Sequence, residues 1–226
     1  MGNSLELDQN HSQKLEEEYD PELQMRPMAQ PATWIVGVLL ATLSCFHYYT
    51  AGFGLLREST HRGVHLAFVL GLIFLVFGLR KKTTSYWTPT FGLIPLYDWL
   101  LAAIAAATCF YVPFVFDDLA FRVGDPLPID VIFGSVMILL TLEATRRSMG
   151  LALPLIAIGF MIYGLYGQYA PGALVHPGAS WKGLVNHLYL TSQGIYGIAV
   201  GVVATYVFHF VLFGVLANRV GAGQLF

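Results

Sequence analysis

The chain has 226 residues, of which 56% are hydrophobic and only 12% are charged, and its formal net charge at pH 7 is −2. An ordinary soluble domain has about 25% charged residues. This composition excludes an ordinary soluble domain and predicts a membrane protein. A weak net charge without a basic stripe also gives no electrostatic basis for binding nucleic acid.

The first thirty residues differ from the rest of the chain. Seven of the 14 acidic residues lie between Glu6 and Glu22, and the segment has no apolar core long enough for a signal peptide. Such a segment cannot bury enough apolar surface to fold. We interpret residues 1–30 as a disordered acidic cytoplasmic tail.

The remaining sequence contains six apolar runs that approach the roughly 20 residues needed to cross a bilayer as a helix. We therefore predict an all-α, polytopic integral membrane protein with about six transmembrane helices. The predicted spans are Ala32–Leu56, Val64–Leu79, Leu96–Phe116, Ile129–Ala144, Leu151–Tyr169 and Ile195–Ala217.

The basic residues predict the orientation of these spans. With a cytoplasmic N-terminus, eight of the 12 Lys and Arg residues fall on the cytoplasmic side, including Arg80, Lys81 and Lys82, as the positive-inside rule prefers. Residues 167–197, between the fifth and sixth spans, are too polar to cross the bilayer. We expect them to form an amphipathic link that lies on the outer interface.

The stretch Thr141–Pro154 concentrates charge between two apolar runs. On a helix, Glu143 can pair with Arg146 and Arg147, which are three and four residues away. One interpretation is topological: the charges end the fourth span at the cytoplasmic side, and Gly150 ends its helix. The other is that the cluster fastens two membrane modules together or contacts a second subunit.

Histidine, aspartate and cysteine residues in the predicted spans are candidate functional residues, and each also has a structural interpretation. His47, His65 and His209 fit hydrogen-bonded helix histidines, while His47 and His65 are also conceivable haem ligands. Asp98 fits a cap of the third span. Cys45 and Cys109 lie in apolar runs, so we expect neither a disulfide nor a metal site.

Glycines recur at the predicted start of the sixth span. Their spacings of three and four would let a neighbouring helix approach the backbone closely. We expect a helix-packing role for them, with a flexible gate as the alternative. The residues are Gly194, Gly197 and Gly201.

Five segments together resemble one family. "LEATRRSMGLALPLIAIGFMIYGLYG", "LVNHLYLTSQGIYGIAVGV" and "GVLANRVGAGQLF" are similar to fused TRAP transporter permeases of the TAXI type, and so are "HRGVHLAFVLGLIFLVF" and "PLYDWLLA" nearer the N-terminus. The likeness covers about residues 57–226.

This resemblance implies a domain organisation. Residues 31–149 would form a four-helix small membrane module. Residues 150–226 would supply the first two helices of the large permease module, with the rest of that module as a partner. The family's sodium and substrate sites lie in re-entrant hairpins, which are expected beyond Phe226.

The resemblance also implies a role in the uptake of a small organic solute, with an organic acid as the expected class, across a bacterial or archaeal cytoplasmic membrane. A periplasmic substrate-binding protein would deliver the solute and an ion gradient would drive its uptake. The acidic loop after the third span is then a candidate docking surface, although it also fits a merely solvated loop. Its charged residues are Asp117, Asp118, Arg122 and Asp125.

No nucleophile with its base, catalytic carboxylate pair, phosphate loop or Cys/His metal cluster is present in the sequence. We therefore expect no enzyme and no cofactor. Two other functions remain open: a haem-binding membrane anchor of an electron-transfer complex, and a membrane interaction protein without transport.

Overall fold

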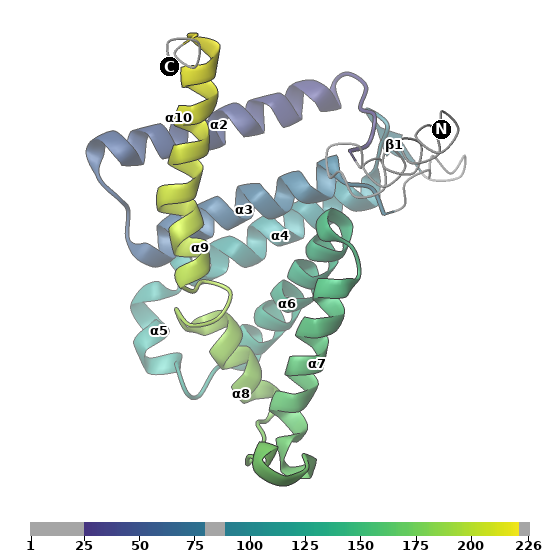
Figure 1. Cartoon of the computed structure of the whole chain (residues 1–226), viewed down its shortest axis with the longest axis vertical. Coiled ribbons are helices and arrows are strands. Elements are labelled where there is room, and N and C mark those ends of the chain that lie inside the picture. Colours follow the sequence, from purple (N-terminus) through teal and green to yellow (C-terminus); the bar gives the residue numbers. More distant parts are fainter. Residues whose placement is uncertain (1–24, 80–88, 222–226) are drawn as a thin grey trace, which may run out of the picture.

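The computed structural model describes residues 25–79 and 89–221 (Figure 1). Most of the predicted acidic tail, residues 1–24, lies outside this part, as do the basic triplet at 80–82 and residues 222–226. The described part is mostly helical. Its two strands are the two-residue β1 (Thr90–Phe91) and β2 (Ile94–Pro95), which pair antiparallel.

The long helices account for the predicted spans. They are α2 (Ala32–Phe53), α3 (Glu58–Val76), α4 (Leu96–Phe114), α6 (Pro128–Met149), α7 (Ala152–Tyr166), and a final run made of α9 (Ile198–Val202), the π-helix η5 (Val203–Val207) and α10 (Phe208–Arg219). Short helices connect them: α5 (Phe116–Arg122), the 3-10 turns η2 (Gly167–Tyr169) and η3 (Gly172–Leu174), α8 (Trp181–Val185) and the π-helix η4 (Asn186–Leu190).

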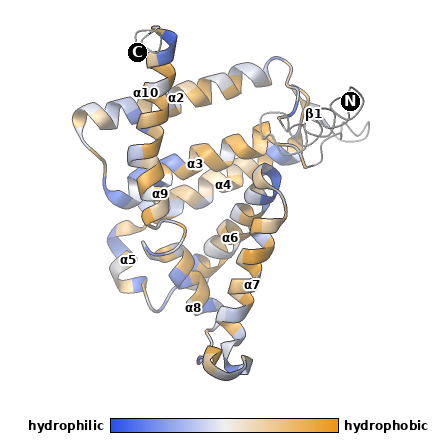
Figure 2. Ribbon diagram, viewed as in Figure 1, coloured by the Kyte–Doolittle hydropathy of each residue, from blue (hydrophilic) through white to orange (hydrophobic). Residues whose placement is uncertain are grey.

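Six helical runs are long and apolar enough to cross a membrane, which confirms the predicted all-α, multi-pass fold. Figure 2 shows hydrophobic residues along these helices and hydrophilic residues concentrated at their ends and in the loops. The runs at 152–169 and 198–219 each have only 11% of their apolar window buried inside the structure. Apolar surface left open on a spanning helix is compatible with contact to lipid.

Several predicted boundaries were wrong by one or two turns. The second span begins at Glu58 rather than Val64, and the fourth continues to Met149 rather than ending at Ala144. The sixth begins at Ile198 rather than Ile195. Hydropathy locates the apolar middle of a helix, but polar end turns remain helical when their side chains find partners in the fold. Gly150, with φ 86°, ends α6 as predicted.

Helices α3 and α4 lie side by side and form the centre of the bundle (Figure 1). They approach closely because Gly63 has no side chain. A Cβ at that position would lie 2.8 Å from the Pro113 ring and 3.0 Å from the backbone oxygen of Cys109. Helix α6 packs against both α3 and α4, and α7 runs back beside α6.

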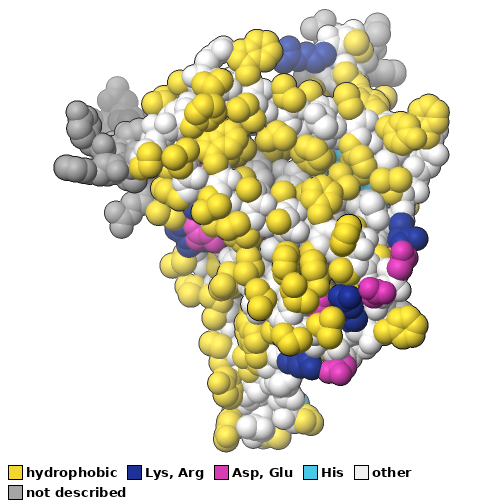
Figure 3. Space-filling view, turned by 180° about the vertical axis from the view of Figure 1, so that it is seen from behind, with side chains coloured by type: hydrophobic (Ala, Val, Ile, Leu, Met, Phe, Trp, Pro, Cys, Tyr) yellow, Lys and Arg dark blue, Asp and Glu magenta, His cyan; other side chains and the backbone are white. Residues whose placement is uncertain are grey.

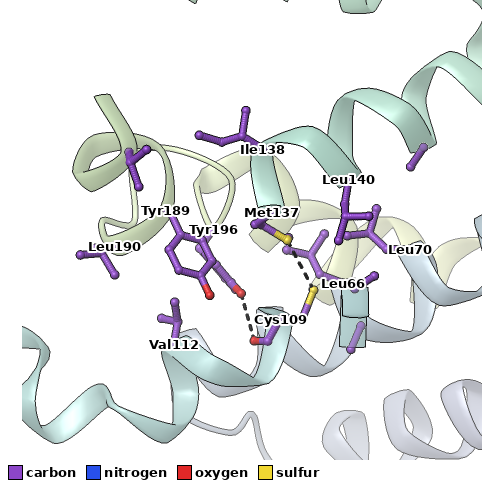
Figure 4. Close-up of a cluster of buried hydrophobic side chains, with 14 of the residues drawn as sticks. Leu66, Leu70, Cys109, Val112, Met137, Ile138, Leu140, Tyr189, Leu190 and Tyr196 are labelled. Carbon is purple, nitrogen blue, oxygen red and sulfur yellow. Dashed lines mark hydrogen bonds between the residues drawn. The ribbon is translucent and has the colours of Figure 1, made fainter. Parts of the chain in front are cut away.

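The main core contains side chains from the link between α7 and α9. Tyr189 and Tyr196 lie among Leu66, Cys109 and Met137, as Figure 4 shows. Their hydroxyls donate hydrogen bonds to the backbone oxygens of Thr108 at 2.6 Å and Cys109 at 3.0 Å. The expectation that the whole link lies on the membrane interface was therefore wrong for its second half, which enters the bundle.

Candidate functional sites at the two ends of the bundle

A buried charge cluster, formed by Arg26, Asp98, Glu143, Arg146 and Arg147, lies where α6 ends and α4 begins. Asp98 is fully buried and accepts hydrogen bonds from Arg147 Nη1 at 2.6 Å and Arg26 Nη2 at 2.7 Å. A buried carboxylate has to be paired because its desolvation is costly. The predicted capping role of Asp98 was wrong: no side chain caps the N-terminus of α4, and the carboxylate serves as an ion-pair centre.

Glu143 connects this buried pair to the surface. Its carboxylate accepts from Arg147 Nε at 2.7 Å and from Arg146 Nε at 2.8 Å, so the predicted pairing of Glu143 with both arginines is present. Arg147 is almost completely buried, and its guanidinium lies 5.1 Å from the centre of the Phe74 ring. This distance is typical of a cation–π contact.

The buried charge cluster joins segments that are far apart in the sequence. Arg26 precedes α2 and also donates to the backbone oxygens of Phe74 and Phe77 at the end of α3. The cluster thus ties the chain before α2 to α3, α4 and α6. Among the described residues, none of its ion pairs reaches α7. The predicted fastening between modules remains a prediction, while the observed fastening lies within residues 26–147.

The acidic loop at the opposite end contains the predicted docking residues. Figure 3 shows charged side chains gathered in a few places, with hydrophobic surface between them. Asp117 pairs with Arg57 at 3.1 Å, Asp118 with Arg122 at 3.2 Å, and the side chains of both aspartates are largely exposed. The loop therefore presents carboxylates that are only weakly engaged.

Asp125 is also exposed, and Lys182 of α8 lies 2.5 Å from it. The hydrogen bond and the positive charge of Lys182 lower the pKa of Asp125 below its ordinary value. The backbone N–H of Gly124 donates to Asn186 Oδ1 at 3.0 Å. These contacts hold the link after α7 against the acidic loop.

Asp130 differs from the other acids of this end because it is fully buried. Its carboxylate accepts from the Leu127 N–H at 2.8 Å, from Tyr111 Oη at 2.5 Å and from Arg122 at 3.4 Å. It therefore caps the first turn of α6, where a negative charge is favourable. Asp130 is therefore not part of the exposed acidic surface formed by Asp117, Asp118 and Asp125.

The three predicted glycines do not share one helix face. Gly194 and Gly197 precede α9 in a turn, and only Gly201 lies inside a helix. A Cβ on Gly201 would lie 2.5 Å from Arg62 Nη2, so close packing occurs there against a side chain. The predicted glycine spacing was therefore not a helix-packing motif.

The histidines form a cluster between α2, α3 and α10. His47 Nε2 lies 3.0 Å from His65 Nδ1, and His209 Nε2 lies 2.9 Å from the backbone oxygen of His47. Axial haem ligands bind opposite faces of the iron, so their nitrogens stand about 4 Å apart. The Phe208 ring also stacks on His47 at 4.1 Å. This arrangement favours packing histidines over haem ligands.

Sequence reasoning missed the residues that join the two halves of the chain. Tyr189 and Tyr196 fill the core, although neither was singled out from the sequence. Arg62 was not singled out either, yet its Nη1 donates to the backbone oxygen of Tyr196 at 2.5 Å. The two tyrosines of "LYLTSQGIYG" were the available sequence signal for a contact with another helix. A tyrosine hydroxyl that becomes buried needs a hydrogen-bond partner, which another helix can provide.

Residues 136–226 match the family described as the tripartite ATP-independent periplasmic transporter, DctM component. No curated protein and no solved structure matches the chain. The matched region begins within α6 and includes α7, the link and the final helical run.

Proposed function

We propose that this chain is the membrane scaffold part of a TRAP-type secondary transporter that takes up a small organic acid. The observation that carries the proposal is the similarity of residues 136–226 to the large TRAP component, in a chain with six helices fit to span a membrane. In this proposal the chain is a fused permease of the TAXI type and belongs to a bacterial or archaeal cytoplasmic membrane.

The proposed role is mechanical rather than enzymatic. The buried charge cluster ties α3, α4 and α6 together, as a body that keeps its position in the bilayer requires. The transport module would move against this scaffold by an elevator mechanism. An ion gradient, with sodium as the proposed ion, would drive symport.

The acidic loop is the proposed contact with a periplasmic binding protein. Asp117, Asp118 and Asp125 expose most of their side chains, and their ion pairs are of the solvent-exposed kind that contributes little to stability. Their carboxylates can therefore exchange an internal partner for a basic residue of a docking protein at small cost. Such rim charges act mainly on the association rate.

The test measures association between the purified chain in nanodiscs and a purified TAXI-type periplasmic binding protein from the same organism. Replacing Asp117, Asp118 and Asp125 together by Asn should slow association about tenfold at low salt, and the difference should shrink as salt screens the charges. Arg219→Gln, at the end of α10, is the control and should leave association unchanged. Failure of the wild-type chain to bind, or equal rates in the triple variant, would contradict the proposed docking.

A further inference from the structure

A cavity of about 390 Å³ lies between the first turn of α3, the end of α4, α5 and the turn after η4. Its apolar wall includes Phe116, Leu119 and Val123, and its polar wall is the start of α3. Small-ligand sites commonly have volumes of about 300–1,000 Å³ and combine apolar walls with a few polar groups. The cavity is large enough for such a ligand.

Arg62 is held in a fixed position on the polar wall. Its Nη1 donates to the backbone oxygen of Tyr196 at 2.5 Å, and its side chain is 14% exposed. Gly201 leaves the space that the guanidinium occupies. A planar guanidinium that is fixed before binding loses little freedom when it forms hydrogen bonds to a carboxylate.

The present acidic partner of Arg62 is replaceable. Glu58 lies one helical turn before Arg62 and pairs with it, but the Glu58 side chain is 59% exposed. Solvent screens an ion pair that has one exposed partner, so the pair contributes little to stability. Another carboxylate can therefore take the place of Glu58 while the backbone contact of Arg62 stays intact.

Ser59 provides a second polar group on the same wall. Within the described residues, its hydroxyl oxygen is buried and has no hydrogen-bond partner. Buried hydroxyls are usually paired, because an unpaired one loses its hydration without compensation. A rotation of the Ser59 side chain about its Cα–Cβ bond would turn this hydroxyl toward the cavity, where a ligand oxygen would supply the missing partner.

We propose that this cavity binds a small monocarboxylate with an apolar body. Arg62 holds the ligand carboxylate in place of Glu58, Ser59 donates a hydrogen bond to it, and the apolar body lies against Phe116 and Leu119. This inference goes beyond the proposed function, since binding can be measured on the isolated chain without uptake and without a binding protein.

The experiment measures binding of radiolabelled benzoate to the full chain in phosphatidylcholine nanodiscs, with empty nanodiscs subtracted. We expect saturable binding that unlabelled benzoate displaces and that neutral benzamide does not. Arg62→Gln should weaken affinity at least about tenfold, because it removes a charged hydrogen-bond donor. Glu58→Gln should tighten affinity about two- to fivefold, because it removes a competing carboxylate of the surface class.

The two variants are expected to change the affinity for benzoate in opposite directions, so a general loss of folding cannot account for both results. Arg62→Gln also loses a contact to Tyr196 and can fail to fold, whereas Glu58→Gln leaves that contact in place. Arg219→Gln removes a positive charge at the end of α10, outside the cavity, and its affinity should equal that of the wild type. Absence of saturable binding to the wild type, or weaker binding to Glu58→Gln, would overturn the proposal.

Discussion

At the level of single residues, the burial of a charged side chain determines how it must be paired. Asp98 has no access to solvent and is satisfied by two arginines, one before α2 and one at the end of α6. Asp118, in contrast, forms an ion pair with Arg122 on the surface. The two aspartates have the same chemistry, and burial alone sets how much each pair contributes to stability.

Replacing Asp98 by Asn should lower the free energy of unfolding by about 3 kcal/mol, because it leaves two arginines without their buried partner. Asp118→Asn is the matched control and should cost no more than about 1 kcal/mol. Thermal unfolding of both variants in detergent measures the difference. Equal stability of the two variants would show that the Asp98 pairs are not structural.

Lys182 controls the ionisation of Asp125. Its hydrogen bond lowers the pKa of Asp125 in the folded state, so this contact contributes stability above the ordinary carboxyl pKa and loses it as the pH falls through the lowered value. Lys182→Gln should therefore raise the pKa of Asp125 toward about 3.9, the model-peptide value. Carboxyl NMR titration measures this change, and an unchanged pKa would exclude the contact in solution.

Among the helices, the packing of the link after α7 against α6 depends on one glycine. A Cβ at Gly134 would lie 2.4 Å from Val185 of α8 and 2.9 Å from the Tyr189 ring. The link can therefore pack on α6 only where this helix lacks a side chain. Gly159 of α7 has open space around it, although it has the same residue type in a neighbouring helix.

Gly134→Ala should destabilise the protein by about 1–3 kcal/mol, because the added methyl overpacks the contact with η4. Gly159→Ala is the control, and it should be neutral or stabilising by up to about 1 kcal/mol through helix propensity. Protease accessibility of the link, together with thermal unfolding, distinguishes the two. Equal effects of both substitutions would mean that the link does not rest on α6.

At the scale of the whole molecule, the two halves of the chain are joined through the link and through the histidines. Tyr189 and Tyr196 bind backbone oxygens of α4, and His209 of α10 binds the backbone oxygen of His47 in α2. Figure 1 shows α10 crossing α2 steeply. The final run thus contacts the first helices although most of its surface is open.

The composition and the apolar runs of the sequence are sufficient to predict the fold class of the protein and the approximate positions of its helices. A charged fraction of 12% and six apolar runs are enough to predict a polytopic all-α membrane protein, because a bilayer requires long apolar helices. The pairing of Glu143 with Arg146 and Arg147 was also predictable, since residues three and four apart on a helix are neighbours.

The tertiary structure decided which polar residues are buried and what they contact. Asp98 meets Arg147 across 49 positions, and Tyr196 meets Cys109 across 87, and no local spacing encodes either contact. Helix boundaries beyond the apolar runs also depended on such partners, as in the last turn of α6. Local periodicity predicts a helix from neighbouring residues alone. A charge or hydroxyl that is buried without a partner costs free energy, and its partner comes from a distant segment that only the folded structure brings near.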